Sequence, residues 1–105
     1  MTTKFNRLTP EDRRESILGI ALGMAEKSDY RHLGRDELAR AANVAAGLIN
    51  FHFGTMANLK VELMRYAVAR SNVEVVAQGL LARDAEALKA PQALRSLAAG
   101  RVFDA

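Results

Sequence analysis

Residues 34–53 read GRDELARAANVAAGLINFHF, and this stretch decides the fold. Its first half places apolar side chains on one helical face, at Leu38, Ala39 and Ala42. The pattern breaks near Asn43, and a second helical pattern follows at Val44, Leu48 or Ile49, and Phe53. Small side chains let two helices approach closely, and we expect such contacts at Ala39, Ala42 and Gly47. The stretch therefore predicts two short helices joined by a tight turn.

A short helix, a tight turn and a second short helix form a helix-turn-helix, whose second helix can lie in the major groove of DNA. The chain has 105 residues, which suits one compact domain or a small domain with one appended interaction element. Half of the residues are hydrophobic and many are Ala, so the core should be thin and helical. A formal charge of +3 and a pI near 9.7 permit binding to nucleic acid without requiring it.

The composition also argues against several classes of protein. The chain contains no Cys, which rules out a disulfide or a thiolate metal site. No apolar run approaches the roughly 20 residues of a membrane span, and residues 1–16 are too polar for a signal peptide. His32 and His52 have no nucleophile or acidic cluster near them in the sequence. We therefore expect a cytoplasmic protein that is not an enzyme and has no catalytic residues, metal site, cofactor or membrane partner.

Other helices have start signals of their own. Thr9 offers a capping hydroxyl and is followed by a proline suited to the first helical position, which predicts a helix that runs to about Lys27. Thr55 can cap another helix. Tyr30 is expected in the core with its hydroxyl in water. Residues 1–8 show no periodicity, and we expect either a frayed terminus or a basic arm that contacts DNA.

Between residues 55 and 90 there is no proline, and apolar residues recur at spacings of three and four, with Arg70 and Asp84 interrupting the pattern. They are Leu59, Leu63, Tyr66, Val73, Ala77, Leu80 and Leu88. The pattern predicts one long helix, or two shorter helices bent near Ser71 or Gly79. A stripe on a projecting helix needs a cover, and we expect the stripe of a second copy to pack on it in a homodimer. The alternative is a hairpin that folds back on its own domain. Residues 92–99 could form a short last helix.

Residues 13–64 resemble, without a gap, the N-terminal DNA-binding domain of TetR-family repressors. The family's Ile-Ala-x-x-Ala-Gly-Val is matched by LARAANV at residues 38–44. Its recognition helix, Ser-x-Gly-x-Leu-Tyr-x-His-Phe, is matched by AAGLINFHF at residues 45–53. Its next helix begins Ser-Lys-x-x-Leu, and residues 55–59 read TMANL. The resemblance implies an all-α fold with a three-helix TetR-like head, and a transcriptional repressor that binds palindromic double-stranded DNA as a homodimer.

The chain departs from the family's pattern at positions that usually contact phosphate. Hydroxyl or ammonium groups are replaced at Leu33, Gly34, Ala45 and Met56. The residues that could take over these contacts are Arg31, His32, Arg35 and Arg40. The departures favour a second interpretation, a protein-interaction module (a decoy or co-regulator) that keeps the fold but has lost DNA binding. The family's ligand-binding domain is large, and residues 65–105 are too few for it, so no small-molecule inducer is expected.

The predicted DNA-binding residues lie on the two short helices. They are Arg35, Arg40, Ala45, Ala46, Gly47, Leu48, Asn50, Phe51 and His52. Arginine and histidine side chains can donate to phosphate, asparagine can bond adenine through two hydrogen bonds, and small apolar side chains can contact thymine methyl groups. The alternative for Asn50 is a solvated residue, and for Leu48 it is partial packing in the core. We assign residues 1–60 to the DNA-binding head and residues 61–105 to a helical dimerisation region.

Overall fold

Helix α1 (Pro10–Lys27) begins where the sequence predicts. The computed structural model describes residues 9–104, and the predicted arm at residues 1–8 lies outside this range. Thr9 Oγ1 accepts a hydrogen bond from the backbone N–H of Asp12 at 3.0 Å, and proline occupies the first helical position. The hydroxyl satisfies an amide that the helix leaves free, which confirms the predicted cap.

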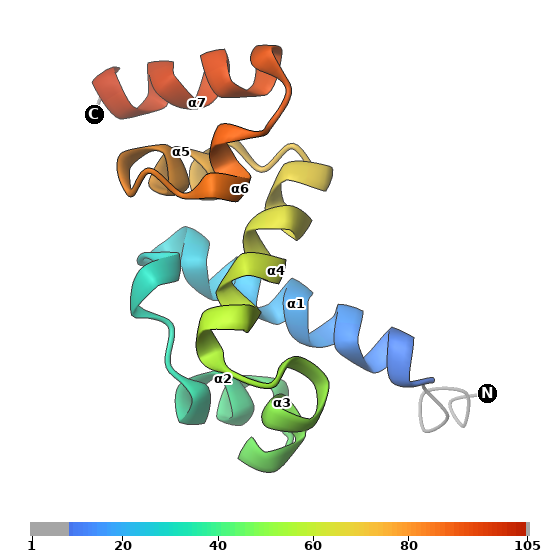
Figure 1. Ribbon diagram of the computed structural model, residues 1–105. Helices are drawn as coiled ribbons and strands as arrows, with labels where there is room; N and C mark the ends of the chain where they lie inside the picture. The colour runs from blue at the N-terminus through green and yellow to red at the C-terminus, as the bar shows by residue number, and fades with distance from the viewer. Residues whose placement is uncertain (1–8, 105) are drawn as a thin grey trace, which may run out of the picture.

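The described chain is helical and contains no strand, so the all-α prediction is confirmed. After α1 come η2 (Tyr30–His32), α2 (Arg35–Ala42), α3 (Ala46–Phe53), α4 (Met56–Ala69), α5 (Val73–Leu81), α6 (Ala85–Leu88) and α7 (Gln92–Asp104). Figure 1 shows α2 and α3 at one end of the molecule and α7 at the other, where α7 lies over α5. Among the helices that the structure describes, none has the length and hydrophobicity needed to cross a bilayer.

The chain after α3 breaks more often than the sequence pattern predicts. Ser71 and Arg83 adopt left-handed backbone conformations, with φ of 54° and 58°, and each separates two helices. The break near Ser71 was one of the two expected positions. The other, Gly79, lies inside α5, and the second break falls after it, at Arg83. The expectation of one long or two shorter helices was therefore wrong. Helix α4 also runs through the assigned boundary at residues 60–61, and the division into two domains stays a prediction.

The apolar stripe of residues 59–88 is covered largely by its own chain. Leu59 and Leu63 are fully buried, and Ala77 is 5 % exposed. Leu80 is half-buried against the same core. Helices α4 and α5 contact α1, and α7 packs along α5. The stripe thus follows the alternative of a hairpin that folds back on its own domain, and the expectation that a second copy covers it was wrong. Leu88 is its one exposed member, at 51 %.

A close contact at Gly79 fixes α5 and α6 on α4. A Cβ atom added at Gly79 would lie 2.6 Å from Ala87 Cβ and 2.6 Å from Met64 Cε. Real Cβ atoms essentially never approach so closely, so glycine is required by packing here rather than by a bend. Met64 and Ala87 are themselves fully buried. The core is continuous from α4 into α5 and α6.

Hydrogen bonds join the end of α1 to α5 and α6. The Gln78 side chain accepts from the backbone N–H of Tyr30 at 2.8 Å and donates to the carbonyl of Ala25 at 2.8 Å. The Tyr30 hydroxyl donates to Asp84 Oδ2 at 2.9 Å. Burial and this hydrogen bond raise the pKa of Tyr30. Tyr30 is in the core as predicted, but its hydroxyl bonds a carboxylate, whereas the sequence suggested water.

Candidate nucleic-acid interface

The turn between α2 and α3 is built by a left-handed residue and two backbone hydrogen bonds. Asn43 ends α2 with φ of 59°, a conformation that Asn tolerates better than most residues. The N–H of Val44 donates to the carbonyl of Ala39 at 3.0 Å, and the N–H of Leu48 donates to that of Ala45 at 2.9 Å. These bonds satisfy backbone groups at both helix ends and hold the predicted tight turn.

Burial of one face of α3 decides which side chains it presents outward. Ile49 and Phe53 are 1 % and 3 % exposed, so Ile49 rather than Leu48 is the core position. The outward side consists of exposed Gly47, Asn50 and Phe51 with half-buried Ala46, Leu48 and His52. Gly47 has no other part of the protein within 4 Å of an added Cβ atom. The expected close helix contact at Gly47 was therefore wrong, although Ala39 is buried between helices.

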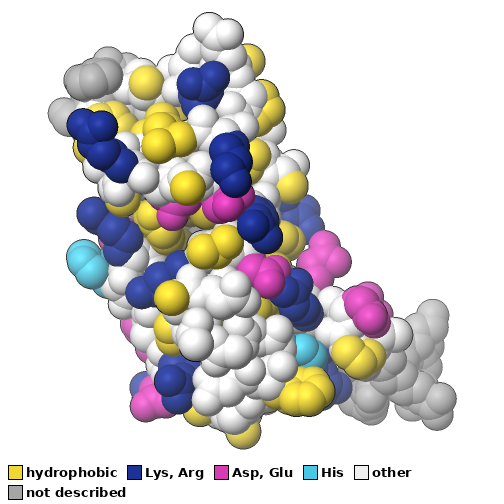
Figure 2. Space-filling model, viewed as in Figure 1, with side chains coloured by type: hydrophobic (Ala, Val, Ile, Leu, Met, Phe, Trp, Pro, Cys, Tyr) yellow, Lys and Arg dark blue, Asp and Glu magenta, His cyan; other side chains and the backbone are white. Residues whose placement is uncertain are grey.

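Both predicted arginines of α2 are exposed. Arg35 and Arg40 project from α2, and Asp36 and Glu37 are exposed on the same helix. A hollow of about 390 Å³ lies between the two short helices and is lined by Asp36, Ala39, Arg40, Val44 and Ala46. Figure 2 shows basic and acidic side chains interspersed over the face in view. The local field is thus mixed in sign, and individual arginines rather than a broad basic surface would contact an anion.

The positions that depart from the TetR pattern supply no polar side chain here. Gly34 and Ala45 are the N-cap residues of α2 and α3, and neither makes a side-chain cap. Leu33 is 6 % exposed and belongs to the core, and Met56 packs against that core. Ala45 is exposed but has no hydrogen-bonding side chain. Only backbone groups can donate to an anion at these positions.

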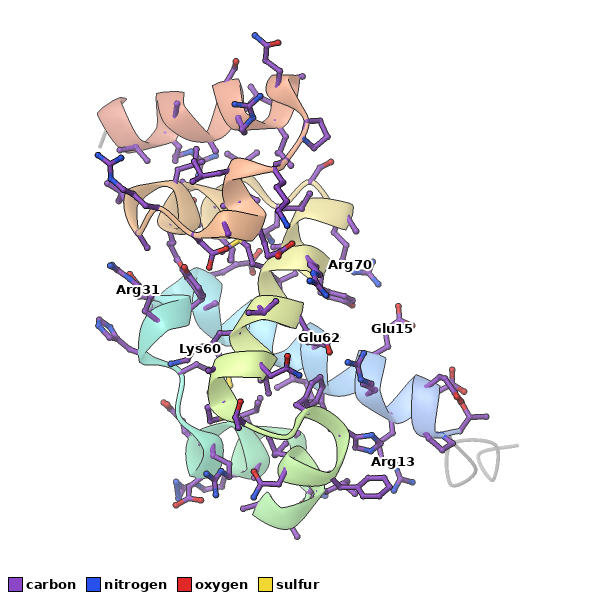
Figure 3. All side chains as sticks on the ribbon, in the orientation of Figure 1. Arg13, Glu15, Arg31, Lys60, Glu62 and Arg70 are labelled. Carbon is purple, nitrogen blue, oxygen red and sulfur yellow. The ribbon has the colours of Figure 1, made fainter. Side chains whose placement is uncertain are left out.

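Arg31, one of the expected replacements, is engaged by its own chain. Its Nε and Nη2 donate to the two carboxylate oxygens of Asp29 at 3.0 and 2.8 Å. These hydrogen bonds lower the pKa of Asp29 to about 2 and raise that of Arg31. Lys60 Nζ donates to the Arg31 carbonyl at 2.7 Å, so both side chains brace η2 (Figure 3). His32 is exposed beside them.

Arg14 holds the C-terminal end of α3 against α1 and α4. Its Nε donates to the carbonyl of His52 at 3.5 Å, and its guanidinium lies 4.9 Å from the centre of the Phe53 ring. It also forms an ion pair with Glu62 of α4, which Figure 3 labels. Sequence reasoning missed this role. The pair Arg13-Arg14 does not signal this contact, because the contact depends on how α1 crosses the end of α3.

Arg13 is a second residue that sequence reasoning missed. A hollow of about 150 Å³ lies between the first turn of α1 and the end of α3, lined by Pro10, Arg13, Leu48, Phe51 and His52. Figure 3 shows Arg13 beside this end of α3. Three of the predicted DNA-binding residues therefore share one hollow with a cation from a helix that contributed none of the predictions.

Within residues 9–104, no group of three or more His, Asp or Glu residues is arranged to hold a metal ion. Two of the nine predicted DNA-binding residues lie on α2, six lie on α3, and Ala45 is the N-cap of α3. No protein-family model, curated protein or solved structure matches the chain.

Proposed function

We propose that this chain is a sequence-specific, DNA-binding transcriptional repressor with a TetR-like head, which binds a palindromic operator as a homodimer in the cytoplasm. Helix α3 would enter the major groove and α2 would lie against the sugar-phosphate backbone. This division of roles is typical of helix-turn-helix proteins, whose backbone contacts position the protein while side chains of the second helix read the bases.

One observation carries the proposal. Helix α3 buries only Ile49 and Phe53, and it leaves Asn50 with small or apolar side chains on its outer side, at one end of the molecule. Asn50 can donate to and accept from adenine at once, and Leu48 can contact a thymine methyl group. Arg40 of α2 lines one hollow with Ala46 of α3, and Arg35 is exposed on α2. These are the chemical groups that direct reading of base pairs needs.

The homodimer and the absence of an inducer site belong to the same proposal. Leu88 and Leu97 are 51 % and 64 % exposed on α6 and α7, at the opposite end from α3, and are available for contact between copies. The close packing of Gly79 on Met64 and Ala87 fills the space between α4, α5 and α6. We therefore propose that repression is controlled by protein concentration or by a protein partner.

A second candidate function is a protein-interaction module that has lost DNA binding. It is favoured by Leu33, which is directed into the core, and by the uncapped starts of α2 and α3 at Gly34 and Ala45. A repressor that relies on phosphate contacts would gain from hydroxyl groups at these positions, because such contacts supply most of the non-specific affinity. The exposed acids Asp36 and Glu37 also favour the protein-interaction module.

Fluorescence-anisotropy titration separates the two candidates. The labelled probe is the duplex immediately upstream of the chain's own coding sequence, and a scrambled duplex of the same composition is the control. We expect tighter binding to the upstream duplex and a Kd that rises with salt. Equal weak binding to both duplexes, or none, would contradict the proposal and support the protein-interaction module.

A further inference from the structure

Phe51 is the most exposed large apolar side chain that the structure describes. It is 76 % exposed, whereas Phe53, two residues later on the same helix, is 3 % exposed. The His52 ring meets Phe51 edge-on, with ring centres 5.1 Å apart. Because Arg14 ties the His52 carbonyl to α1, the backbone that carries Phe51 is fixed. An aromatic ring held in water in this way is available as a contact surface.

Arg13 is the charged residue in the hollow beside this ring. Arg13 and His52 line the hollow beside Phe51, and no acidic side chain is among its lining residues. Glu11 and Glu15 instead line a different hollow, together with Arg14. Among the described residues Arg13 has no ion-pair partner, in contrast to Arg14, which is paired with Glu62. Asp12 is the one exposed acid that adjoins Arg13 in the chain, and it is outside the lining of the Phe51 hollow.

We propose that the hollow between α1 and the end of α3 binds one deoxyribose-phosphate unit of the DNA backbone. Phe51 packs on the sugar ring, and Arg13 donates to the adjoining phosphate. A phenyl ring has no hydrogen-bonding group with which to distinguish base pairs, so this contact is independent of sequence. The inference rests on the proposed function and assigns a positioning role to a helix outside the two short helices.

The contact replaces some of the phosphate-binding side chains that the chain lacks at the starts of α2 and α3. No donor side chain is present at the N-terminal ends of α2 and α3, where the chain has Leu33, Gly34 and Ala45. An arginine from α1 restores one charged contact at the opposite end of α3. Since α1 also carries Arg14, the same helix that binds the phosphate holds α3 in place. DNA binding would then orient α3 through a rigid two-helix unit.

The test uses a labelled duplex of mixed sequence and about two helical turns (~20 base pairs), because the contact requires no particular bases. Kd is measured at several salt concentrations for the wild type, Phe51→Ala and Arg13→Gln. We expect Phe51→Ala to weaken binding about tenfold with an unchanged salt slope, since it removes apolar contact only. We expect Arg13→Gln to reduce the salt slope by about 0.9 per bound copy, and Arg13→Lys to retain it.

Matched controls come from the far end of the molecule. Leu81→Ala removes a side chain that is 64 % exposed, and Arg83→Gln removes an exposed charge. Both should bind as the wild type does, and circular dichroism should show equal helix content in every variant. If the wild type binds DNA and the Phe51 and Arg13 variants match the controls, this inference is overturned while the proposed function stands. If the wild type binds no duplex, the proposed function fails first.

Discussion

A methyl group added at Gly79 tests how tightly α5 and α6 are packed on α4. Glycine inside a helix is usually unfavourable relative to alanine by about 1 kcal/mol, so Gly79→Ala would stabilise α5 in isolation. In the folded chain the new carbon would lie 2.6 Å from Ala87 Cβ and from Met64 Cε, and 3.1 Å from Met64 Sδ. Ala87 Cβ is attached directly to the backbone, so α6 itself must move.

The two effects can be weighed against each other. Adding a methylene group to a filled core typically costs about 1–3 kcal/mol, and the two closest contacts here place the cost toward the upper end. After subtraction of the helix-propensity gain, we expect Gly79→Ala to lower the free energy of unfolding by about 1–2 kcal/mol. Gly23 on α1 is the matched control, because an added Cβ there meets nothing within 4 Å. Gly23→Ala should raise the free energy of unfolding by about 1 kcal/mol.

Urea unfolding followed by circular dichroism measures both changes. With a slope of about 1–2 kcal/mol per molar urea, the midpoint should fall by roughly 1 M for Gly79→Ala and rise by roughly 0.5–1 M for Gly23→Ala. Adding Ala87→Gly to the Gly79→Ala chain should recover part of the loss, because it removes one of the two contacts. A Gly79→Ala midpoint as high as that of Gly23→Ala would refute the reasoning, since it would mean that the interface yields without cost.

Three further predictions concern hydrogen bonds and recognition. Tyr30→Phe removes the bond to the Asp84 carboxylate and should lower the free energy of unfolding by about 1.5–3 kcal/mol in urea titrations, whereas an unchanged midpoint would show that the bond is not formed in solution. Arg31 holds the pKa of Asp29 near 2, so the stabilisation from this pair is complete above about pH 4 and is lost as the pH falls toward 2. Asp29→Asn should flatten the plot of unfolding free energy against pH in this range, and a plot identical to that of the wild type would contradict the pairing. Asn50→Ala should relax specificity at one position per half-site, at a cost of about 1–3 kcal/mol measured on matched and mismatched duplexes, and equal discrimination would remove the reading role.

The start signals of helices could be predicted because they are local. A hydroxyl at Thr9 or Thr55 meets an amide three residues later whatever the rest of the chain does, and both caps are present. Asn72 and Asp84 cap α5 and α6 by the same chemistry. They were missed because apolar residues stay in helical register across both breaks, with Tyr66 seven residues before Val73 and Leu80 eight residues before Leu88. In this stretch the caps were better evidence of helix boundaries than the periodicity.

The candidate site was predictable where it depends on helical spacing alone. A helix that buries Ile49 must present Asn50 and Phe51 elsewhere, and both are exposed. The contributions of Arg13 and Arg14 could not be predicted, because they depend on how α1 crosses the end of α3. Spacing within one helix carries no information about that crossing. The same limit explains Gly79, whose neighbours are 15 residues before it on α4 and eight after it on α6.

The bonds of Gln78 also have a consequence for the order in which the chain folds. The carbonyl of Ala25 and the amide of Tyr30 find their partner 53 and 48 residues further along the chain. Closing a loop of this length costs conformational entropy before any contact is gained. The backbone N–H of Tyr30 in η2 should therefore become protected from hydrogen exchange only when α5 docks. The end of α1, η2 and α5 then open and close as one cooperative unit, and a destabilising change at α5 should speed exchange at Tyr30.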